Sequence, residues 1–467
     1  MKPAKYVDMC SGPILRKMIV FTLPIMFSGL FQLLFNATDI IVVGKFAGDN
    51  ALAAVGSNSA LINLMTNLFI GLSIGANVVA ARYCGAKNIT ELRRTVHTAM
   101  TLSVISGFIL MAAGLLFAEQ ILRLMSTPES IIGMAASYLR IYFCGMPFMM
   151  IYNFGNALLR AAGDTRRPLI YLICAGVINV LLDLLFVILF NMSAAGVGLA
   201  TTLSQGVSAF LMVRCLMREK EENGLKLELR KLRIHRDKLG MIMKIGLPAG
   251  FQGMVFSLSN VVIQSSINLF GEVVIAGNSA AASIEGFVYM AMNSCYQSTL
   301  SFTSQNLGAG KYERINRILL CGLTCVVAVW AILGLGVTMT CGRKLLGIYT
   351  SGEAAIDAGQ HRMMYVCGTY FLCGIMDVMV GSLRGMGYSI TPMIVSLLGA
   401  CGLRLVWLGT VFQMEQYHTP DVVYLSYPVS WVITVAAHVI CFFICRHRLK
   451  LKVQQQEKER LVIETQQ

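Results

Sequence analysis

The sequence is poor in charged residues. Asp, Glu, Lys and Arg make up 13% of its 467 residues, whereas hydrophobic residues make up 56% and the mean hydropathy is +0.67. The charged share is about half of that in an average soluble protein. It is too small to cover the surface of soluble domains of this length. This composition excludes a secreted disulfide scaffold, a disordered chain and an ordinary cytosolic enzyme.

Motifs for several kinds of chemistry are missing as well. The 14 cysteines form no Cys-x-x-Cys pair, and the chain contains neither a His-Glu-x-x-His motif nor a P-loop. A zinc site, a redox centre and ATP hydrolysis within this chain are therefore not expected. The net charge of +14 is spread over short loops, so we expect no nucleic-acid partner. We predict that the protein is not an enzyme and needs no cofactor.

Long apolar runs are what the sequence does contain. Runs of about 20 residues or more can each cross a membrane as a helix. Twelve such runs have the approximate ranges 15–43, 51–80, 95–117, 131–158, 169–190, 194–216, 241–270, 275–307, 315–339, 357–383, 391–412 and 424–445. The first run is too long for the core of a signal peptide, so we expect it to be inserted and retained.

The basic residues predict how these spans are oriented. With the N-terminus inside, 31 of the 38 Lys and Arg residues fall in inner segments, which favours a cytoplasmic location for both termini. The six residues on the outer side would be Lys45, Arg123, Arg140, Arg343, Lys344 and Arg362.

The chain also repeats itself at an offset of about 224 residues. Leu23-Pro24 returns as Leu247-Pro248, and Leu159-Arg160 returns as Leu383-Arg384. Each half carries six spans, an even number, so the two copies run the same way through the membrane, as in many transporters. We predict an all-α integral membrane protein with an N-terminal lobe (1–217), a cytoplasmic linker (218–240), a C-terminal lobe (241–446) and a cytoplasmic tail (447–467).

Four of the 24 acidic residues lie inside the expected spans: Asp39, Asp183, Glu285 and Asp377. An ionised carboxylate at mid-bilayer costs about 2.5–3.5 kcal/mol on insertion scales, so such residues usually mark an ion or substrate path. The structural alternative is a carboxylate that packs between helices and is held by neighbouring hydrogen bonds.

Two of these acids have polar neighbours in the pattern. Helical rise places Asp39, Asp183 and Thr201 at similar depth in the outer half of the bilayer. Asn179 precedes Asp183 by four residues and so shares its helix face. Two carboxylates, an amide and a hydroxyl suit a proton or a hard cation. These four residues are our candidate coupling site.

The C-terminal half lacks counterparts of this site. The positions equivalent to Asp39, Asn179 and Asp183 hold Ile263, Leu403 and Trp407, respectively. Arg404 is expected near mid-bilayer, where it needs an anionic neighbour. We predict that Arg404 forms a buried pair or triad with Glu285 or Asp377, in a charge network or on the substrate pathway.

Two further features have predicted mechanical roles. Pro24 permits a bend in the first span, and we predict that it acts as a hinge. The loops 82–94 and 306–317 occupy equivalent inner positions, where Gly-Ala turns end long helices. We interpret these loops as rigid elbows and not as phosphate-binding loops.

Together these motifs resemble the multidrug and toxic compound extrusion (MATE) family over nearly the full length of the chain. The motifs that carry the resemblance are Pro24 fifteen residues before Asp39, Gly85-Ala86-Lys87, Gln305-Asn306-Leu307-Gly308-Ala309-Gly310-Lys311, Leu159-Arg160-Ala161-Ala162-Gly163-Asp164, Leu383-Arg384-Gly385-Met386-Gly387 and Asn179-x3-Asp183. The resemblance implies two six-helix lobes forming a V, alternating access, and export driven by inward flow of protons or sodium.

The resemblance also implies roles for individual residues. It matches the four candidate coupling residues to the N-lobe cation site of the family, and Asp377 to a C-lobe acid of its sodium-coupled members. Phe256 stands where that branch has a second acid.

On this basis we predict a secondary active antiporter of the bacterial inner (plasma) membrane. It would export amphipathic, often cationic drugs or toxic organic compounds in exchange for protons or sodium, with sodium as the only metal expected. We expect it to function as a monomer within the lipid bilayer. The alternative is a lipid-linked-intermediate flippase of the same superfamily; by resemblance such flippases often have fourteen spans and a basic cavity.

Overall fold

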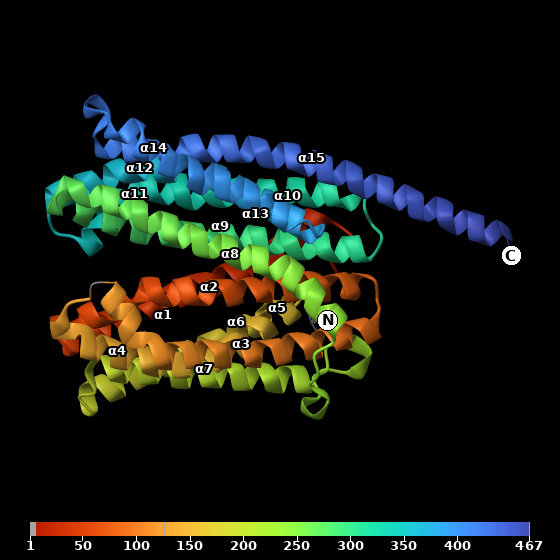
Figure 1. Cartoon of the computed structure of the whole chain (residues 1–467), viewed down its shortest axis with the longest axis horizontal. Helices are drawn as coiled ribbons and strands as arrows, with labels where there is room; N and C mark the ends of the chain where they lie inside the picture. The colour runs from red at the N-terminus through yellow and green to blue at the C-terminus, as the bar shows by residue number, and fades with distance from the viewer. Residues whose placement is uncertain (1–5, 126, 467) are drawn as a thin grey trace.

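The computed structural model describes residues 6–125 and 127–466, which are almost entirely helical (Figure 1). The helices of the N-terminal lobe are α1 (Ile14–Phe46), α2 (Asp49–Gly85), α3 (Ile89–Leu124), α4 (Glu129–Cys144), α5 (Met146–Ala162), α6 (Arg166–Leu184) and α7 (Ser193–Met217). Those of the C-terminal lobe are α8 (Arg236–Ile267), α9 (Glu272–Gly308), α10 (Arg314–Val329), α11 (Thr338–Tyr349), α12 (Glu353–Gly385), α13 (Ile390–Ser396), α14 (Leu403–Gly409) and α15 (Pro420–Gln466).

Short helical segments complete these elements. The π-helical segments η1 (Leu185–Leu189), η5 (Trp330–Val337) and η6 (Leu397–Gly402) continue or join α-helices within a span. Single 3₁₀ turns lie at η2 (Glu221–Asn223), η3 (Leu229–Lys231), η4 (Asn268–Phe270), η7 (Val411–Gln413) and η8 (Glu415–Tyr417).

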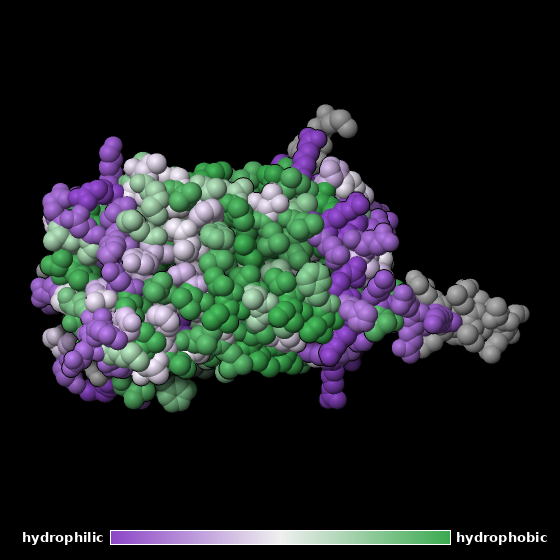
Figure 2. All heavy atoms as spheres, turned by 90° about the horizontal axis from the view of Figure 1, so that it is seen from above, coloured by the Kyte–Doolittle hydropathy of each residue, from purple (hydrophilic) through white to green (hydrophobic). Residues whose placement is uncertain are grey.

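The expected number of membrane spans is confirmed. Eleven helices or continuous helical stretches of the described chain are long and apolar enough to cross a membrane, and the pair α4 and α5, bent by 45°, supplies the twelfth. Hydrophobic side chains gather in the middle of the face that Figure 2 shows, with hydrophilic ones at both ends. The chain is a multi-pass membrane protein.

The repeat predicted from the sequence is present in the backbone. Gly163, after α5, and Gly387, after α12, have φ values of 99° and 97°. At both positions the amide of the next residue donates to a carbonyl five residues back, at Leu159 and Leu383. This hydrogen bond and the left-handed glycine form a Schellman motif, which ends the helix. The same six-residue signal therefore ends both helices.

The elbow loops follow the same rule. Lys87 after α2 and Gly310 after α9 both have positive φ, 53° and 69°. Gly48 and Gly271, which precede these two helices, have nearly identical backbone angles, with φ of 85° and 86°. Equivalent glycines thus precede the two helices, and a residue of positive φ follows each of them.

The two lobes lie side by side along their length (Figure 1). Residues 218–235, which connect α7 to α8, lie at one end of the molecule, which we call the linker end. The start of the described chain is there too, since Tyr6 donates a hydrogen bond to Glu219. The distal part of α15 also lies at the linker end, where Arg446 donates a hydrogen bond to the Tyr312 carbonyl. The domain boundaries given above stay a prediction.

Candidate functional site

The four N-lobe residues predicted to couple transport come together where α1, α6 and α7 meet. The Thr201 hydroxyl donates to Oδ2 of Asp39 at 3.4 Å. The carboxyl groups of Asp39 and Asp183 lie within hydrogen-bonding reach of each other. Asn179 lies one turn before Asp183 on α6 and is also buried. We call this cluster the N-lobe acid site; its role in coupling stays a prediction.

Close packing of α1 on α6 brings the acids together. Gly176 leaves room for the ring of Phe35, because a Cβ at position 176 would lie 1.9 Å from Cε2 of that ring. Asp39 and Asn179 follow these two contact residues by about one helical turn. The π-helical segment η1 begins two residues after Asp183, and such segments are frequent at functional sites.

Among the residues that the structure describes, no cationic side chain balances the charges of the N-lobe acid site. The Asp183 side chain is 0% exposed, and no salt bridge to it or to Asp39 occurs among the described residues. While both acids are ionised neither can donate, so both oxygens of Asp183 and Oδ1 of Asp39 have no hydrogen-bond partner in the described part of the chain. Adjacent carboxylates repel unless a proton or cation lies between them. The carboxylate oxygens of Asp39 and Asp183, together with the Asn179 amide, are suited to bind either a proton or a cation.

The buried acid of the C-lobe is neutralised. Glu285 of α9 accepts two hydrogen bonds from Arg362 of α12, at 2.8 and 2.7 Å. The same guanidinium donates to Asn278 at 2.6 Å and lies over the rings of Tyr424 and Tyr427. Arg362, expected on the outer side, is thus the buried partner of Glu285.

The predicted pairing of Arg404 with Glu285 or Asp377 is wrong. Nε of Arg404 donates to the Ser430 hydroxyl at 2.8 Å. Its guanidinium lies 4.3 Å from the ring centroid of Tyr427 and 5.3 Å from that of Trp431. Aromatic faces attract a desolvated cation by about 2 kcal/mol or more. The rings of α15 therefore stabilise the buried guanidinium, a role that we expected a carboxylate to have.

Asp377 has different neighbours. Its carboxyl lies within hydrogen-bonding reach of the Tyr289 phenol and in electrostatic contact with Arg384. Arg384 in turn donates to the Tyr296 hydroxyl at 2.9 Å and to Gln252 at 2.8 Å. Asp377 therefore belongs to a network between α8, α9 and α12 and not to the surroundings of Arg404.

Two of the contacts between the lobes are helix crossings that are equivalent in the repeat. At the α2–α8 crossing, a Cβ on Gly75 would lie 2.9 Å from the Gly246 nitrogen. At the α1–α9 crossing, the equivalent residues are Ser298 and Thr22, whose hydroxyls lie 2.7 Å apart. The α2–α8 crossing is thus held by contact between backbones, and the α1–α9 crossing by a hydrogen bond between side chains.

The elbow loops meet at the linker end. A Cβ on Gly85 would lie 1.9 Å from the Gln305 carbonyl oxygen, and one on Gly308 would lie 1.9 Å from the Arg82 carbonyl oxygen. Because each glycine abuts the helix end of the opposite lobe, both elbows take part in the contact between lobes.

The N-terminal strap, residues 6–13, joins both lobes at this end. The Val7 amide donates to the Gly163 carbonyl of the N-lobe at 3.0 Å. Three C-lobe side chains donate to its carbonyl oxygens: Asn306 to Met9 at 3.0 Å, Lys311 to Cys10 at 2.8 Å and Arg314 to Gly12 at 3.2 Å. Burial and the neighbouring Glu219 raise the pKa of the Tyr6 phenol, which therefore stays a hydrogen-bond donor.

Comparison with known proteins assigns the family. The family model MatE matches two segments, residues 24–185 and 248–408, one in each lobe. The chain belongs to the MATE family. The two matched segments start 224 residues apart, as the repeat requires.

Similarity to known proteins extends over almost the whole chain. It is 26% identical over 429 residues to the probable multidrug resistance protein YoeA of Bacillus subtilis, with 90% of this chain and 91% of the relative covered. It is 27% identical over 424 residues to the probable multidrug resistance protein YpnP of the same organism, with 87% and 92% covered. A solved structure, the outward-facing conformation of a multidrug resistance MATE family transporter, superposes with a TM-score of 0.86 at 20% identity, covering 97% of this chain and 99% of that one. The V-shaped, two-lobe MATE fold is thereby confirmed.

The structure of this MATE protein adds residues to the N-lobe acid site that the sequence analysis did not identify. Tyr138 and Tyr142 of α4 are in electrostatic contact with Asp39, and their ring centroids lie 5.9 Å apart. The Gln205 side chain of α7 lies close to the Tyr142 phenol. The i, i+4 spacing of the two tyrosines predicts that they share a face, but hydropathy does not predict that α4 packs on α7, beside the acids.

Proposed function

We propose that this MATE protein is a secondary active antiporter that exports amphipathic, often cationic drugs or toxic organic compounds in exchange for protons or sodium. The observation that carries the proposal is the N-lobe acid site, in which Asp39 and Asp183 adjoin and no cationic side chain of the described residues pairs with them. The names of the two Bacillus subtilis relatives support the substrate class.

The coupling ion would act at the N-lobe acid site. A proton taken up by one carboxyl turns it into a donor for the other, whereas sodium would use the carboxylate oxygens and the Thr201 hydroxyl as ligands. Either ion removes the repulsion between Asp39 and Asp183, so its arrival and departure change how tightly α1 packs on α6.

Helix α1 is suited to carry this change to the contact between the lobes. Its second half bears Asp39 against α6 and α7, while its first half packs on the C-lobe, where Phe21 meets Phe302 at 5.6 Å between ring centroids. Thr22, at the α1–α9 crossing, lies about 25 Å from Asp39 along the helix, with Pro24 between them. We infer alternating access in which ion binding at Asp39 alters this crossing, with Pro24 as the hinge.

The distribution of basic residues supports a cytoplasmic location of the linker end, in a bacterial inner membrane. The two lobes contact each other at or near that end, through the close approach of helices at glycines and through the hydrogen bonds of the strap. The conformation would then be closed towards the cytoplasm and ready to receive the coupling ion from outside. We propose that the monomer is the transporting unit.

The proposal is tested with purified protein in liposomes loaded with a fluorescent organic cation. Vesicles receive an inward proton gradient, an inward sodium gradient, or neither, and dye movement against its own gradient is followed. We expect accelerated movement with one of the two ion gradients, and its abolition by the matching ionophore. Equal dye movement without any gradient contradicts antiport. Gradient-independent transfer of a labelled lipid across the bilayer would favour the flippase.

A further inference from the structure

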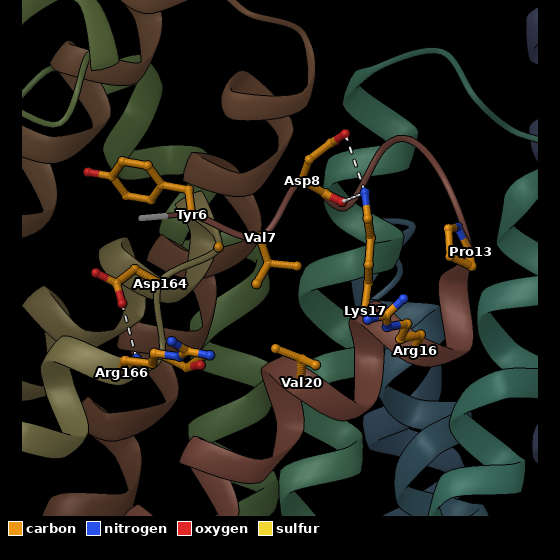
Figure 3. A pocket seen from close by; sticks show the side chains of 11 residues that line it. Tyr6, Val7, Asp8, Pro13, Arg16, Lys17, Val20, Asp164 and Arg166 are labelled. Carbon is orange, nitrogen blue, oxygen red and sulfur yellow. Dashed lines mark hydrogen bonds and ion pairs between the residues drawn. The ribbon is translucent and has the colours of Figure 1, made fainter. Parts of the chain in front are cut away.

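A cavity of about 480 Å³ opens at the linker end between the strap, the beginning of α1 and the turn from α5 to α6 (Figure 3). We call it the strap cavity. Arg16, Lys17 and Val20 of α1 line one side, and Asp164 and Arg166 line the other. It lies outside the N-lobe acid site and the charge network of the C-lobe.

The course of α1 creates this cavity. Towards the end away from the linker, α1 packs on α6 at the contact of Phe35 with Gly176. Near the linker end it packs on the C-lobe instead, where Thr22 binds Ser298. The two helices therefore diverge towards the linker end, and the strap crosses the space that opens between them.

The acidic groups of the strap cavity are already engaged. Asp8 accepts from the Cys10 amide at 2.9 Å and forms an ion pair with Lys17. Asp164 accepts from the Arg166 amide at 3.0 Å and forms an ion pair with Arg167. Each carboxylate thus has a cationic partner and backbone donors, and neither adds uncompensated negative charge.

Two cationic groups, by contrast, are unengaged. The side chains of Arg16 and Arg166 are exposed on opposite sides of the cavity (Figure 3). Neither guanidinium has a hydrogen-bond or ion-pair partner in residues 6–125 and 127–466. A guanidinium pairs well with phosphate oxygens because its donors form a planar fork.

Apolar surface continues from the cavity into the membrane band. Val20, on the cavity wall, is 40% exposed, and Leu23, the next residue on that side of α1, is 43% exposed. On α6, Ile170 follows Arg166 by one turn and is 54% exposed. Paired basic groups above exposed aliphatic side chains match a phosphate headgroup followed by acyl chains.

We propose that the strap cavity binds the headgroup phosphate of an anionic phospholipid from the leaflet at the linker end. Arg16 and Arg166 contact the phosphate, and the acyl chains run past Val20. Because this lipid touches the strap, α1 and α6 together, it holds the strap in place and favours the state in which both lobes are joined at this end. The site is independent of the coupling ion and of Asp39.

The test uses the full-length protein in neutral detergent, titrated with phosphatidylglycerol or phosphatidylcholine, with the thermal unfolding midpoint and native mass spectrometry as readouts. We expect phosphatidylglycerol to bind and raise the midpoint more than phosphatidylcholine. Arg16→Gln combined with Arg166→Gln removes two phosphate contacts and should weaken phosphatidylglycerol binding about tenfold to thirtyfold. Arg166→Gln alone should weaken it about threefold to fivefold.

The matched control is Arg230→Gln combined with Arg233→Gln, which removes the same charge from exposed positions of the linker. It should leave phosphatidylglycerol binding within twofold of the unmodified protein. If both double variants lose phosphatidylglycerol binding equally, the effect comes from the net charge of the protein, and the proposal is overturned. Glycerol phosphate at the same concentration should not raise the midpoint; if it acts like phosphatidylglycerol, the ligand is a free phosphate and the lipid assignment is wrong.

Discussion

The two lobes bury acidic side chains in opposite ways. In the N-lobe, Asp39 and Asp183 adjoin each other with no cationic side chain in the described chain to balance them. In the C-lobe, Glu285 is bound by both arms of Arg362. A carboxylate paired with arginine has no charge left for another cation, whereas two adjacent carboxylates require one. The two lobes share the backbone of the repeat, but Glu285 is paired with an arginine whereas Asp39 and Asp183 are not, among the described residues.

The largest effect is expected at Asp39. Asp39→Asn removes the carboxylate on the helix that reaches both lobes, so gradient-driven export should fall to the level of protein-free vesicles while the unfolding midpoint stays within about 2 °C. Proteoliposome transport and thermal unfolding measure the two quantities. Glu272→Gln, an exposed acid at the start of α9, is the control and should transport normally. Full export by Asp39→Asn would remove the N-lobe acid site from the mechanism.

The opposite outcome is expected at the C-lobe pair. Arg362→Met leaves Glu285 buried without its partner, which typically costs about 3–5 kcal/mol. We expect a much lower unfolding midpoint and poor yield. Adding Glu285→Met removes the stranded charge and should recover most of the loss. If the double variant is as unstable as Arg362→Met, the stability comes from packing of the arginine and not from the pair.

Asp183→Asn should reduce export to an intermediate level. Asp183 lies on α6, within the N-lobe, so its loss weakens ion binding without removing the carboxylate on α1. Transport assayed side by side with Asp39→Asn decides the order. A complete loss with Asp183→Asn and a partial one with Asp39→Asn would reverse the assignment.

Arg404→Leu should destabilise the protein by about 2 kcal/mol, the value of a desolvated cation–π contact. The loss is smaller than for Arg362→Met because no carboxylate is left unpaired. Thermal unfolding of the two variants in the same detergent gives the comparison. Rescue of Arg404→Leu by Asp377→Leu would instead indicate the ion pair that the structure lacks.

The smallest effect is expected for Thr201→Ala. It removes one hydrogen bond of 3.4 Å to Asp39, worth up to about 1.5 kcal/mol. The ion concentration for half-maximal export should rise, by no more than about tenfold, and the maximal rate should be unchanged. Thr201→Ser, which keeps the hydroxyl, should behave like the unmodified protein.

The spans, the repeat and the N-lobe cluster were predictable from the sequence for physical reasons. Apolar runs end at Gly, Pro or charge, and helical rise then fixes the depth of Asp39, Asp183 and Thr201. Asn179 shares the face of Asp183 because it lies four residues earlier. Each of these predictions concerns the length, depth or face of a single helix, and the sequence of that helix is sufficient to make it.

The pairing of the C-lobe charges could not be obtained in this way. Arg404 is held by Ser430 and two rings of α15, whose position depends on how the spans pack and not on hydropathy. The distribution of basic residues places Arg362 on the outer side, because the pattern does not show that Asn278 and Glu285 face it. The bend between α4 and α5 and the π-helical turn after Asp183 likewise have no signal in apolar periodicity.

The manner in which the strap is held has a consequence for how this segment can vary. The C-lobe side chains recognise carbonyl oxygens, which every amino acid provides, so these three hydrogen bonds do not depend on which side chains the strap carries. Gly12 is constrained by its φ of 65°, and Met9 by the full burial of its side chain. The number of residues between Val7 and Gly12 is constrained throughout, since one inserted residue would move the acceptors out of register with Asn306, Lys311 and Arg314. Length, more than composition, is what this segment must preserve.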